Sequence, residues 1–505
     1  MSSNQGIHGV LLLLVLTLTF TLVYRAHSDY PYPLHVDEWQ HISKALQVTG
    51  EERLVFTDPH FKSMRVKVTH EEGFSVFMAV LFELTGLDII LFYKFLPALS
   101  AVFTAITLYV LARRLFSPVI ALTSLFFLAS VKSNVNILGF FFYTPLSASF
   151  PLMFLTALAV VNALSRDDTA WFAAAILLVL AQCILYPVAA MFMILVSLIY
   201  LMTTPGKTRE LCMKIAGEKK YLLTYALITF IILAGLTLQY GSTKKFYHTI
   251  ADRIIFPQNE IPFDVTYSII KLYGIRASAA AFLGVLVIGY HLARQRGQGE
   301  SGAQKMLVYW LLIAYLGIFM YHKRDYTIVL PYHRALYYGM LGMAPLSAVG
   351  SIWLVRFVRR FFRLPYFFVP VVVAVLFSSV LWDSFGDYYN PPSDVTLYHV
   401  IEDGDYTALT WFAGEYGGGH NFLAPYWPSV AVYPVSGNYV SITLSAVYGG
   451  GSKDDLDAFF NGDCDTKKRL SRYRGIDHVF SNKVLNCTFL ENVYEKDKRF
   501  IYEVV

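Results

Sequence analysis

The sequence predicts a polytopic α-helical membrane protein that ends in a small soluble α/β domain. The chain of 505 residues is 56% hydrophobic and only 15% charged, which is too apolar for a soluble protein of this length. Long apolar runs recur over the first three quarters of the chain, close to the roughly 20 residues that cross a bilayer. From residue 383 onward Gly, Asp, Asn and Tyr replace Leu and Val, and this change of composition predicts a separate domain.

The apolar runs predict about eleven transmembrane helices. They cover residues 9–24, 89–112, 119–131, 147–164, 170–185, 188–202, 221–239, 272–292, 306–320, 335–355 and 365–381. The first run lacks a basic n-region and a small-residue cleavage site, so we interpret it as a retained helix and not as a signal peptide. A further run, residues 73–87, is short and contains Glu83. Because a carboxylate is costly in hydrocarbon, we expect an interfacial or re-entrant helix there.

The distribution of basic residues predicts the orientation. With a cytoplasmic N-terminus, the inner loops hold about twice as many Lys and Arg residues as the short outer loops, as the positive-inside rule expects. This distribution holds only if residues 73–87 do not cross. Residues 1–382 then form a membrane domain whose long first loop, residues 25–88, faces outward together with residues 383–505. The net charge of +5 is too small to indicate a nucleic-acid partner.

The closing segment reads as helices alternating with short strands, which is typical of an α/β domain. We expect helices at residues 406–416, from Ser452 onward and at 465–473, and strands at 421–424, 430–435, 477–480 and 500–504. Cys464 and Cys487 lie in this domain and could pair if it faces an oxidising side. The acceptor pattern Asn486-Cys487-Thr488 also fits an outward face.

An adjacent carboxylate pair, Asp37 and Glu38, follows Pro33 in the first outer loop and begins a predicted helix at residues 37–48. Acidic residues at such a position commonly only cap the helix. Here Trp39 and residues 73–87 could shield the pair from water, which favours a second interpretation. A carboxylate in a half-dry site can act as a general base that takes a proton from an acceptor hydroxyl. We therefore predict Asp37 as the base and Glu38 as its supporting group.

A basic cluster lies in the outer loop between the predicted helices 306–320 and 335–355. It comprises Lys323, Arg324, His333 and Arg334. Cations beside a span commonly extend to lipid headgroups of the membrane, but these stand on the outer side, against the general trend. Arginine and lysine suit a lipid phosphate and would stabilise charge on a phosphate leaving group. Another outer loop, residues 239–263, also carries cations, and we expect an amphipathic surface helix there.

Other motifs are absent or uninformative. The first outer loop contains five histidines, but their spacing beside Asp37 and Glu38 does not match a metal site, and we predict none: His27, His35, His41, His60 and His70. The sequence has no P-loop, no GxGxxG after a strand, no CxxC pair and no HExxH. The aromatic run at residues 140–143 is expected to pack in the interior or to line the membrane interface.

Three short stretches match a known pattern. They are Asp37-Glu38 in the first outer loop, His70-Glu71-Glu72-Gly73-Phe74 before the apolar run that ends at Thr85-Gly86, and Leu111-Ala112-Arg113-Arg114-Leu115-Phe116 after the next span. Together they resemble the GT-C membrane glycosyltransferases, most closely the protein O-mannosyltransferase and aminoarabinose-transferase branch. The layout resembles that family over residues 9–355. The closing stretches Gly475-Ile476-Asp477-His478-Val479 and Phe500-Ile501-Tyr502-Glu503-Val504 are similar to soluble domains that end archaeal members.

The resemblance implies an enzyme that passes a sugar from a polyprenyl (dolichyl) phosphate carrier to an acceptor on a glycan, protein or lipid. It implies that Asp37, with Glu38 beside it, lies at the catalytic centre and that Lys323, Arg324 and Arg334 hold the lipid phosphate. We expect inversion at the anomeric carbon and no cofactor. Residues 132–145 contain no carboxylate, which disfavours a metal-bound mechanism. The tail has no Trp-Trp-Asp motif, which argues against recognition of sequons. The alternatives are a transporter or lipid-carrier flippase, and a non-catalytic receptor.

Overall fold

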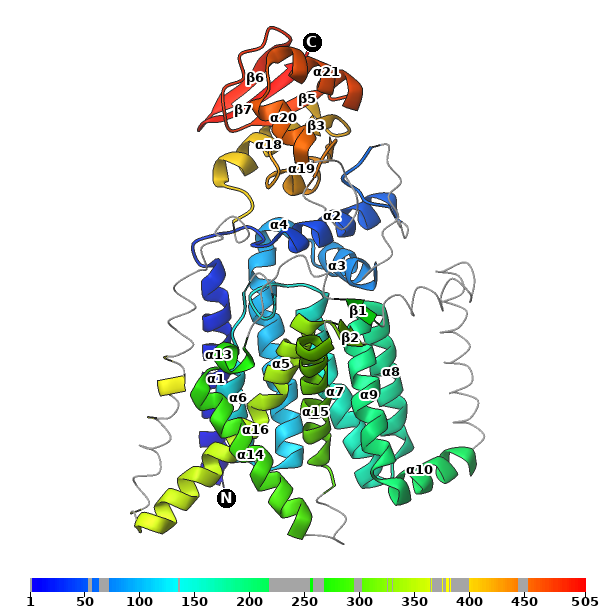
Figure 1. Cartoon of the computed structure of the whole chain (residues 1–505), viewed down its shortest axis with the longest axis vertical. Helices are drawn as coiled ribbons and strands as arrows, with labels where there is room; N and C mark the ends of the chain where they lie inside the picture. The colour runs from blue at the N-terminus through cyan, green and yellow to red at the C-terminus, as the bar shows by residue number, and fades with distance from the viewer. Residues whose placement is uncertain are drawn as a thin grey trace. The chain divides into compact units, whose positions relative to one another are not determined.

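The computed structural model describes most of the chain in two compact units (Figure 1). It describes residues 2–52, 57–62, 72–134, 137–217, 255–257, 268–294, 302–324, 326–328, 330–363, 365, 375, 378–380, 382, 399–443 and 453–505. The first unit, here the helical unit, consists of Met1–Tyr24, Pro97–Phe141 and Pro145–Pro391. The second, here the mixed unit, consists of Arg25–Leu96, Phe142–Thr144 and Pro392–Val505.

The helical unit is a bundle built around its longest described helix, α16 (Tyr332–Phe362), which packs against α6, α14 and α15. A Cβ atom on Gly350 of α16 would lie 1.9 Å from the Ala280 carbonyl oxygen of α14, so only glycine permits this close approach. The other elements of this unit are α1 (Ser2–Tyr24), α5 (Leu96–Leu115), α6 (Pro118–Ala129), α7 (Pro145–Arg166), α8 (Thr169–Leu185), α9 (Pro187–Met202), α10 (Pro205–Gly217), β1 (Ile255–Pro257), α13 (Ile269–Tyr273), α14 (Ile275–Arg294), α15 (Lys305–Arg324) and β2 (Tyr326–Ile328). Strands β1 and β2 pair antiparallel.

The multi-pass prediction is supported, but the predicted number of spans is not confirmed. Six of the described helices are long and apolar enough to cross a bilayer, or seven if α9 and α10, which are bent by 104°, form one span. Helices α6, α8 and α9 form where spans were predicted, but they have only 12, 17 and 16 residues. The predicted span at 221–239 lies outside the described residues, as does nearly all of the one at 365–381. The run at 73–87 forms a short helix, α3 (Glu72–Thr85).

The mixed unit contains the first loop and a five-stranded sheet. Its part Arg25–Leu96 folds into η1 (Arg25–His27), α2 (Val36–Glu51), α3, α4 (Ile89–Phe92) and η2 (Tyr93–Phe95). The closing segment folds into α18 (Asp403–Tyr416), β3 (Asn421–Leu423), α19 (Ser429–Ser436), β4 (Tyr439–Val440), α20 (Lys453–Asn461), α21 (Cys464–Arg474), β5 (His478–Ser481), β6 (Leu490–Lys496) and β7 (Arg499–Val504). The strand order is β4-β3-β5-β7-β6. Strand β3 is parallel to both of its neighbours, whereas β7 is antiparallel to β5 and β6, so the α/β prediction is confirmed.

The centre of the sheet is buried on both faces because an apolar cluster covers each face. Val479 belongs to a cluster with Phe459 of α20, whereas the next residue of β5, Phe480, belongs to one with Phe412 of α18. Successive side chains of a strand point to opposite faces, which is why all four residues of β5 are buried. This two-sided packing makes β5 the centre of the closing segment.

The predicted strand at residues 430–435 is wrong, because these residues form helix α19. The run is rich in valine, which has a high strand propensity, but tertiary packing overrides such preferences. Helix α19 buries Val430, Ala431 and Val432 and contacts α2 and α18. Pro428 precedes the helix, and Gly437 follows it in the left-handed conformation (φ 68°), which are ordinary helix boundaries. The predicted cap at Ser452 lies outside the described residues, although α20 follows it as expected.

Within the mixed unit, the start of the first loop packs against the closing segment. The Tyr30 hydroxyl donates to the Ile401 carbonyl oxygen at 2.8 Å, and its ring stacks on His399 with centroids 4.2 Å apart. The Tyr32 ring lies 4.9 Å from that of Tyr406. Residues 25–88 and the closing segment therefore belong to one compact body, whereas the domain boundary at residues 382 and 383 stays a prediction.

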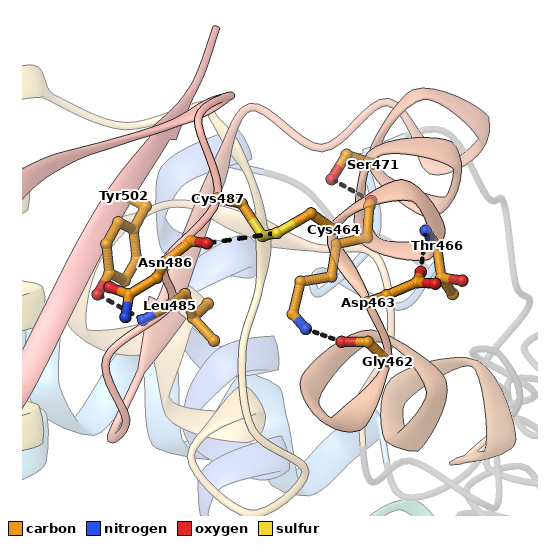
Figure 2. The surroundings of a disulfide bond; sticks show 10 residues. Gly462, Asp463, Cys464, Thr466, Ser471, Leu485, Asn486, Cys487 and Tyr502 are labelled. Carbon is orange, nitrogen blue, oxygen red and sulfur yellow. Dashed lines mark hydrogen bonds between the residues drawn. A yellow bond between two sulfur atoms is a disulfide. The ribbon is translucent and has the colours of Figure 1, made fainter.

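A disulfide joins Cys464, at the start of α21, to Cys487, in the segment before β6 (Figure 2). Cys487 is part of the cluster that contains Phe459 and Tyr502. The bond thus closes a loop of 23 residues over one face of the sheet. The sequence allowed a bond between Cys464 and Cys487 without requiring it, and the structure contains that bond.

Removing the disulfide is expected to destabilise the closing segment. For a closed loop of this length, the lost chain constraint corresponds to about 3 kcal/mol of unfolding free energy. Thermal unfolding of Cys464→Ser, compared with the wild type in the presence and absence of reductant, measures the effect. Cys212→Ser, which changes an exposed free cysteine, is the matched control. An unchanged midpoint in Cys464→Ser would contradict a stabilising role of the bond.

Candidate active site

Helix α2 begins with a reciprocal cap that fixes the conformation around Asp37 and Glu38. His35 is the N-cap residue, and its Nδ1 accepts the backbone N–H of Asp37 at 3.1 Å. In return, Oε2 of Glu38 accepts the backbone N–H groups of Leu34 (2.8 Å) and His35 (3.0 Å). This arrangement satisfies amides that a helix start leaves without intrahelical partners. The capping interpretation therefore holds for Glu38.

Glu38 also ties α2 to a distant segment of the mixed unit. Its Oε1 accepts the backbone N–H of Tyr143 at 2.7 Å, and its side chain is fully buried. Burial raises the pKa of Glu38 to about 8, against the opposing effect of the three N–H donors. Glu38 is thus a buried side chain that accepts three backbone N–H groups, here called the Glu38 clamp. Because it is buried, it cannot contact a reactant in solution.

Asp37, in contrast, keeps its carboxylate accessible. Its side chain is 41% exposed, and Oδ2 lies 3.7 Å from His35 Nδ1. Because that nitrogen accepts the Asp37 N–H, it carries a lone pair and no proton. His41 follows one turn later on α2, and burial lowers its pKa to about 4, so it is neutral at pH 7. Neither neighbouring histidine therefore neutralises the Asp37 carboxylate.

Aromatic side chains line the same part of the mixed unit. Phe74 of α3 lies 4.9 Å from the His41 ring and 5.4 Å from the Tyr143 ring, measured between centroids. Trp39 is completely buried, and its Nε1 donates to the Pro33 carbonyl oxygen at 3.1 Å. Phe74 thus packs beside α2, in which Trp39 is buried, whereas the predicted shielding of the Asp37 carboxylate from water stays a prediction.

The four predicted phosphate ligands belong to the helical unit, at two helix ends. Lys323 and Arg324 lie in the last turn of α15 and are exposed, where the helix macrodipole favours positive charge. His333 and Arg334 lie in the first turn of α16 and are partly buried. The N-terminal end of a helix disfavours cations, so the Arg334 side chain must be stabilised by other contacts.

Arg334 is held by two segments that are distant in sequence. Its Nε donates to the Tyr186 hydroxyl at 3.0 Å, and a terminal guanidinium nitrogen donates to the Ile137 carbonyl oxygen at 3.1 Å. Tyr186 connects α8 and α9, and Ile137 lies in the loop before α7. These contacts orient the guanidinium plane of Arg334.

The aromatic run at residues 140–143 is buried throughout, which agrees with a packing role. Gly139, just before it, adopts a φ of +111°, and a Cβ atom there would lie 2.2 Å from the Tyr337 ring. The Tyr337 hydroxyl accepts the backbone N–H of Phe140 at 3.0 Å. A glycine is thus required where this loop meets α16.

The structure brings Asp37 and Glu38 together on α2 and places the four cations at the two helix ends of the other unit. The sequence did not identify Tyr143, Tyr186 and Ile137, because each meets its partner across more than a hundred residues and has no local signal. Among the described residues, no group of three or more His, Cys, Asp or Glu side chains could hold a metal ion. His70 lies outside the described residues, as does residue range 239–263 apart from 255–257.

Comparison with known proteins gives a likeness in structure only. No protein-family model matches the chain, and no curated protein matches its sequence. ArnT from Cupriavidus metallidurans, bound to undecaprenyl phosphate, is 11% identical with a TM-score of 0.62, over 100% of this chain and 99% of ArnT. The oligosaccharyltransferase AglB from Archaeoglobus fulgidus, in complex with an inhibitory peptide and a dolichol-phosphate, is 11% identical with a TM-score of 0.60, over 95% of this chain and 70% of AglB. The chain therefore shares its fold with ArnT and AglB.

Proposed function

We propose that this chain is an integral membrane glycosyltransferase that moves a sugar from a polyprenyl phosphate-linked donor to an acceptor hydroxyl. The observation that carries the proposal is the accessible Asp37 carboxylate on a rigidly capped helix start, in a fold shared with ArnT and AglB. The ArnT structure contains bound undecaprenyl phosphate, and the AglB structure contains a dolichol-phosphate. A general base at a fixed position and a lipid phosphate leaving group are what this transfer requires.

In the proposed step, the acceptor oxygen attacks the anomeric carbon of the donor as its proton passes to the Asp37 carboxylate. The bond between that carbon and the phosphate oxygen breaks, and its electron pair leaves with the polyprenyl phosphate. Attack opposite to the leaving group inverts the anomeric carbon. Because the donor is already activated, no nucleotide is consumed. Lys323, Arg324, His333 and Arg334 supply the positive charge that stabilises the released phosphate.

The proposal includes a cytoplasmic N-terminus, about eleven spans and an outward-facing mixed unit. The disulfide between Cys464 and Cys487 supports an outward closing segment, because such bonds persist mainly on oxidising sides of membranes. The acceptor hydroxyl would then be met on that side, on a glycan, a protein or a lipid.

The test uses the purified full chain in liposomes with a polyprenyl phosphate donor labelled in its sugar. The proposal expects the label to move to an acceptor and polyprenyl phosphate to accumulate. A flippase would expose the labelled headgroup to the opposite leaflet without cleaving it, and a receptor would bind the lipid without either change. Either of those results, with pooled candidate acceptors present, would refute the transferase proposal.

Arg334→Lys is expected to weaken use of the donor. A lysine ammonium lacks the planar fork that reaches the Tyr186 hydroxyl and the Ile137 carbonyl oxygen together. If the ammonium is no longer held in place and one charged hydrogen bond to the lipid phosphate of about 1.5 kcal/mol is lost, KM for the lipid-linked donor should rise roughly tenfold or more. Initial-rate measurements over a range of donor concentration determine it. Arg356→Lys, an exposed position on the same helix, is the control, and equal KM values for the two variants would exclude Arg334 from donor binding.

A further inference from the structure

A buried polar cluster lies where the first loop meets the closing segment inside the mixed unit. His60 is 1% exposed and Asp58 is 4% exposed. His60 Nδ1 lies 2.8 Å from Asp58 Oδ1, and the same oxygen accepts the His60 backbone N–H at 3.0 Å. His60 Nε2 lies 3.1 Å from Ser43 Oγ on α2 and 3.2 Å from the Val430 carbonyl oxygen on α19. One imidazole thus touches three separate segments.

The partners of His60 are hydrogen-bond acceptors at both nitrogens of its ring. Asp58 at Nδ1 and the Val430 carbonyl at Nε2 are both acceptors, so each of these contacts requires an N–H on the ring. The Ser43 hydroxyl lies 2.8 Å from the Trp39 carbonyl oxygen, to which it donates, and therefore it can only accept from His60. The ring therefore faces acceptors at both nitrogens, with the Asp58 carboxylate beside Nδ1 and the Val430 carbonyl beside Nε2. Burial raises the pKa of Asp58, but the neighbouring His60 outweighs this effect and holds that pKa below its ordinary value.

The spacing also resembles a Ser-His-Asp nucleophile arrangement, but its hydrogen bonds do not suit that chemistry. A nucleophilic serine must donate its proton to a neutral histidine nitrogen. Here the hydroxyl proton of Ser43 is directed to the Trp39 carbonyl, and the Val430 carbonyl oxygen also faces Nε2. Ser43 is fully buried, so no substrate could reach it. The cluster is therefore built to hold segments together.

The segments that it holds are α2, which carries Asp37, and the closing segment. Besides the Nε2 contact with Val430, the His60 carbonyl oxygen accepts the N–H of Val440, in edge strand β4, at 2.7 Å. Lys62 Nζ donates to the Gly419 carbonyl oxygen at 2.8 Å. Helix α2 packs directly against α19. Residues 57–62 thus form a polar link between the sheet and the helix of the candidate base.

We propose that His60, paired with Asp58, is a positioning residue that sets the orientation of α2 and hence of Asp37 by bridging Ser43 to Val430. This inference rests on the proposed function, because it assigns the closing segment a role in placing the base. Ser43 lies six residues after Asp37 on the same rigid helix, so a shift at Ser43 displaces the carboxylate. A displacement of about 1 Å at a reacting group can lower turnover by about 10²-fold.

Two substitutions of His60 separate this role from simple stabilisation of the loop. In His60→Asn the amide nitrogen takes the place of Nδ1 and keeps the Asp58 contact, whereas in His60→Gln it takes the place of Nε2 and keeps the bridge to Ser43 and Val430. We expect kcat to fall about 10²-fold in His60→Asn and to stay within about threefold in His60→Gln, with KM for the donor unchanged in both. His420→Gln, in the closing segment, is the control and is expected to keep wild-type kinetics.

Thermal unfolding of each variant is recorded alongside the kinetics. Equal kcat values for His60→Asn and His60→Gln would overturn the positioning role. So would kcat values that merely follow the order of the unfolding midpoints of the variants. Neither result would affect the proposed function. Wild-type protein that transfers no sugar refutes the proposed function itself. A fluorophosphonate probe is expected to leave Ser43 unlabelled, and labelling that disappears in Ser43→Ala would show that the cluster is a nucleophilic site instead.

Discussion

Asp37→Asn is expected to lower sugar transfer by about 10²- to 10⁴-fold, the usual contribution of a general base. The amide has nearly the same shape as the carboxylate but cannot accept the proton of the attacking hydroxyl. The side chain is 41% exposed, and the backbone N–H of Asp37 makes the contact to His35 Nδ1. The substitution should therefore remove the base and leave the helix cap in place. Turnover with labelled lipid-linked donor measures the loss.

The matched control for this experiment is Asp29→Asn, which changes an exposed carboxylate in the same loop. It is expected to keep wild-type turnover and unfolding behaviour. KM for the donor should also change little in Asp37→Asn, because the base acts in the transition state and not in binding of the lipid phosphate. Near-normal turnover in a folded Asp37→Asn protein would remove Asp37 from the mechanism.

The features that depend on local composition were predictable from the sequence. Apolar runs located the long membrane helices, because the length of an apolar segment is itself the physical requirement for crossing. The helix that follows Asp37 and Glu38 was expected, and it begins one residue earlier, at Val36. The alternation of helices and strands after residue 400 predicted the α/β domain. A fold like that of ArnT and AglB was expected from the layout and from three short motifs.

The features that depend on contacts between distant segments were not predictable. The valine-rich residues 430–435 carry the propensity of a strand, and only packing against α2 and α18 explains why they are helical. Glu38 was expected to support Asp37, but the sequence has no sign that its carboxylate would accept the N–H of Tyr143, 105 residues away. His60 was considered only as a metal ligand, whereas its partner at Val430 is 370 residues distant.

Glu38→Ala is expected to be among the most destabilising single substitutions in the mixed unit. It leaves the buried N–H groups of Leu34, His35 and Tyr143 without the acceptor that they share. Each unsatisfied buried donor costs about 1 to 3 kcal/mol, so the loss in unfolding free energy should be roughly 3 to 9 kcal/mol. Glu38→Gln restores only part of this, because an amide oxygen placed at Oε2 directs its NH₂ group toward the Tyr143 N–H. Thermal unfolding in detergent, with Asp29→Asn as the control, measures both variants.

The pH dependence of the unfolding free energy tests whether the Glu38 carboxyl itself contributes to stability. Because burial raises the pKa of Glu38 from 4.5 to about 8, the folded protein holds more protons than the unfolded chain between these values. The contribution of Glu38 to the unfolding free energy must therefore be greatest below pH 4.5 and must decline as the pH rises to about 8. Glu38→Gln cannot ionise, so this part of the slope should vanish in that variant and persist in Asp29→Asn. If the unfolding free energies of the wild type and of Glu38→Gln fall in parallel across this range, titration of the buried Glu38 carboxyl does not contribute to stability. The contacts of Glu38 with the three N–H groups must then account for its stabilisation of α2.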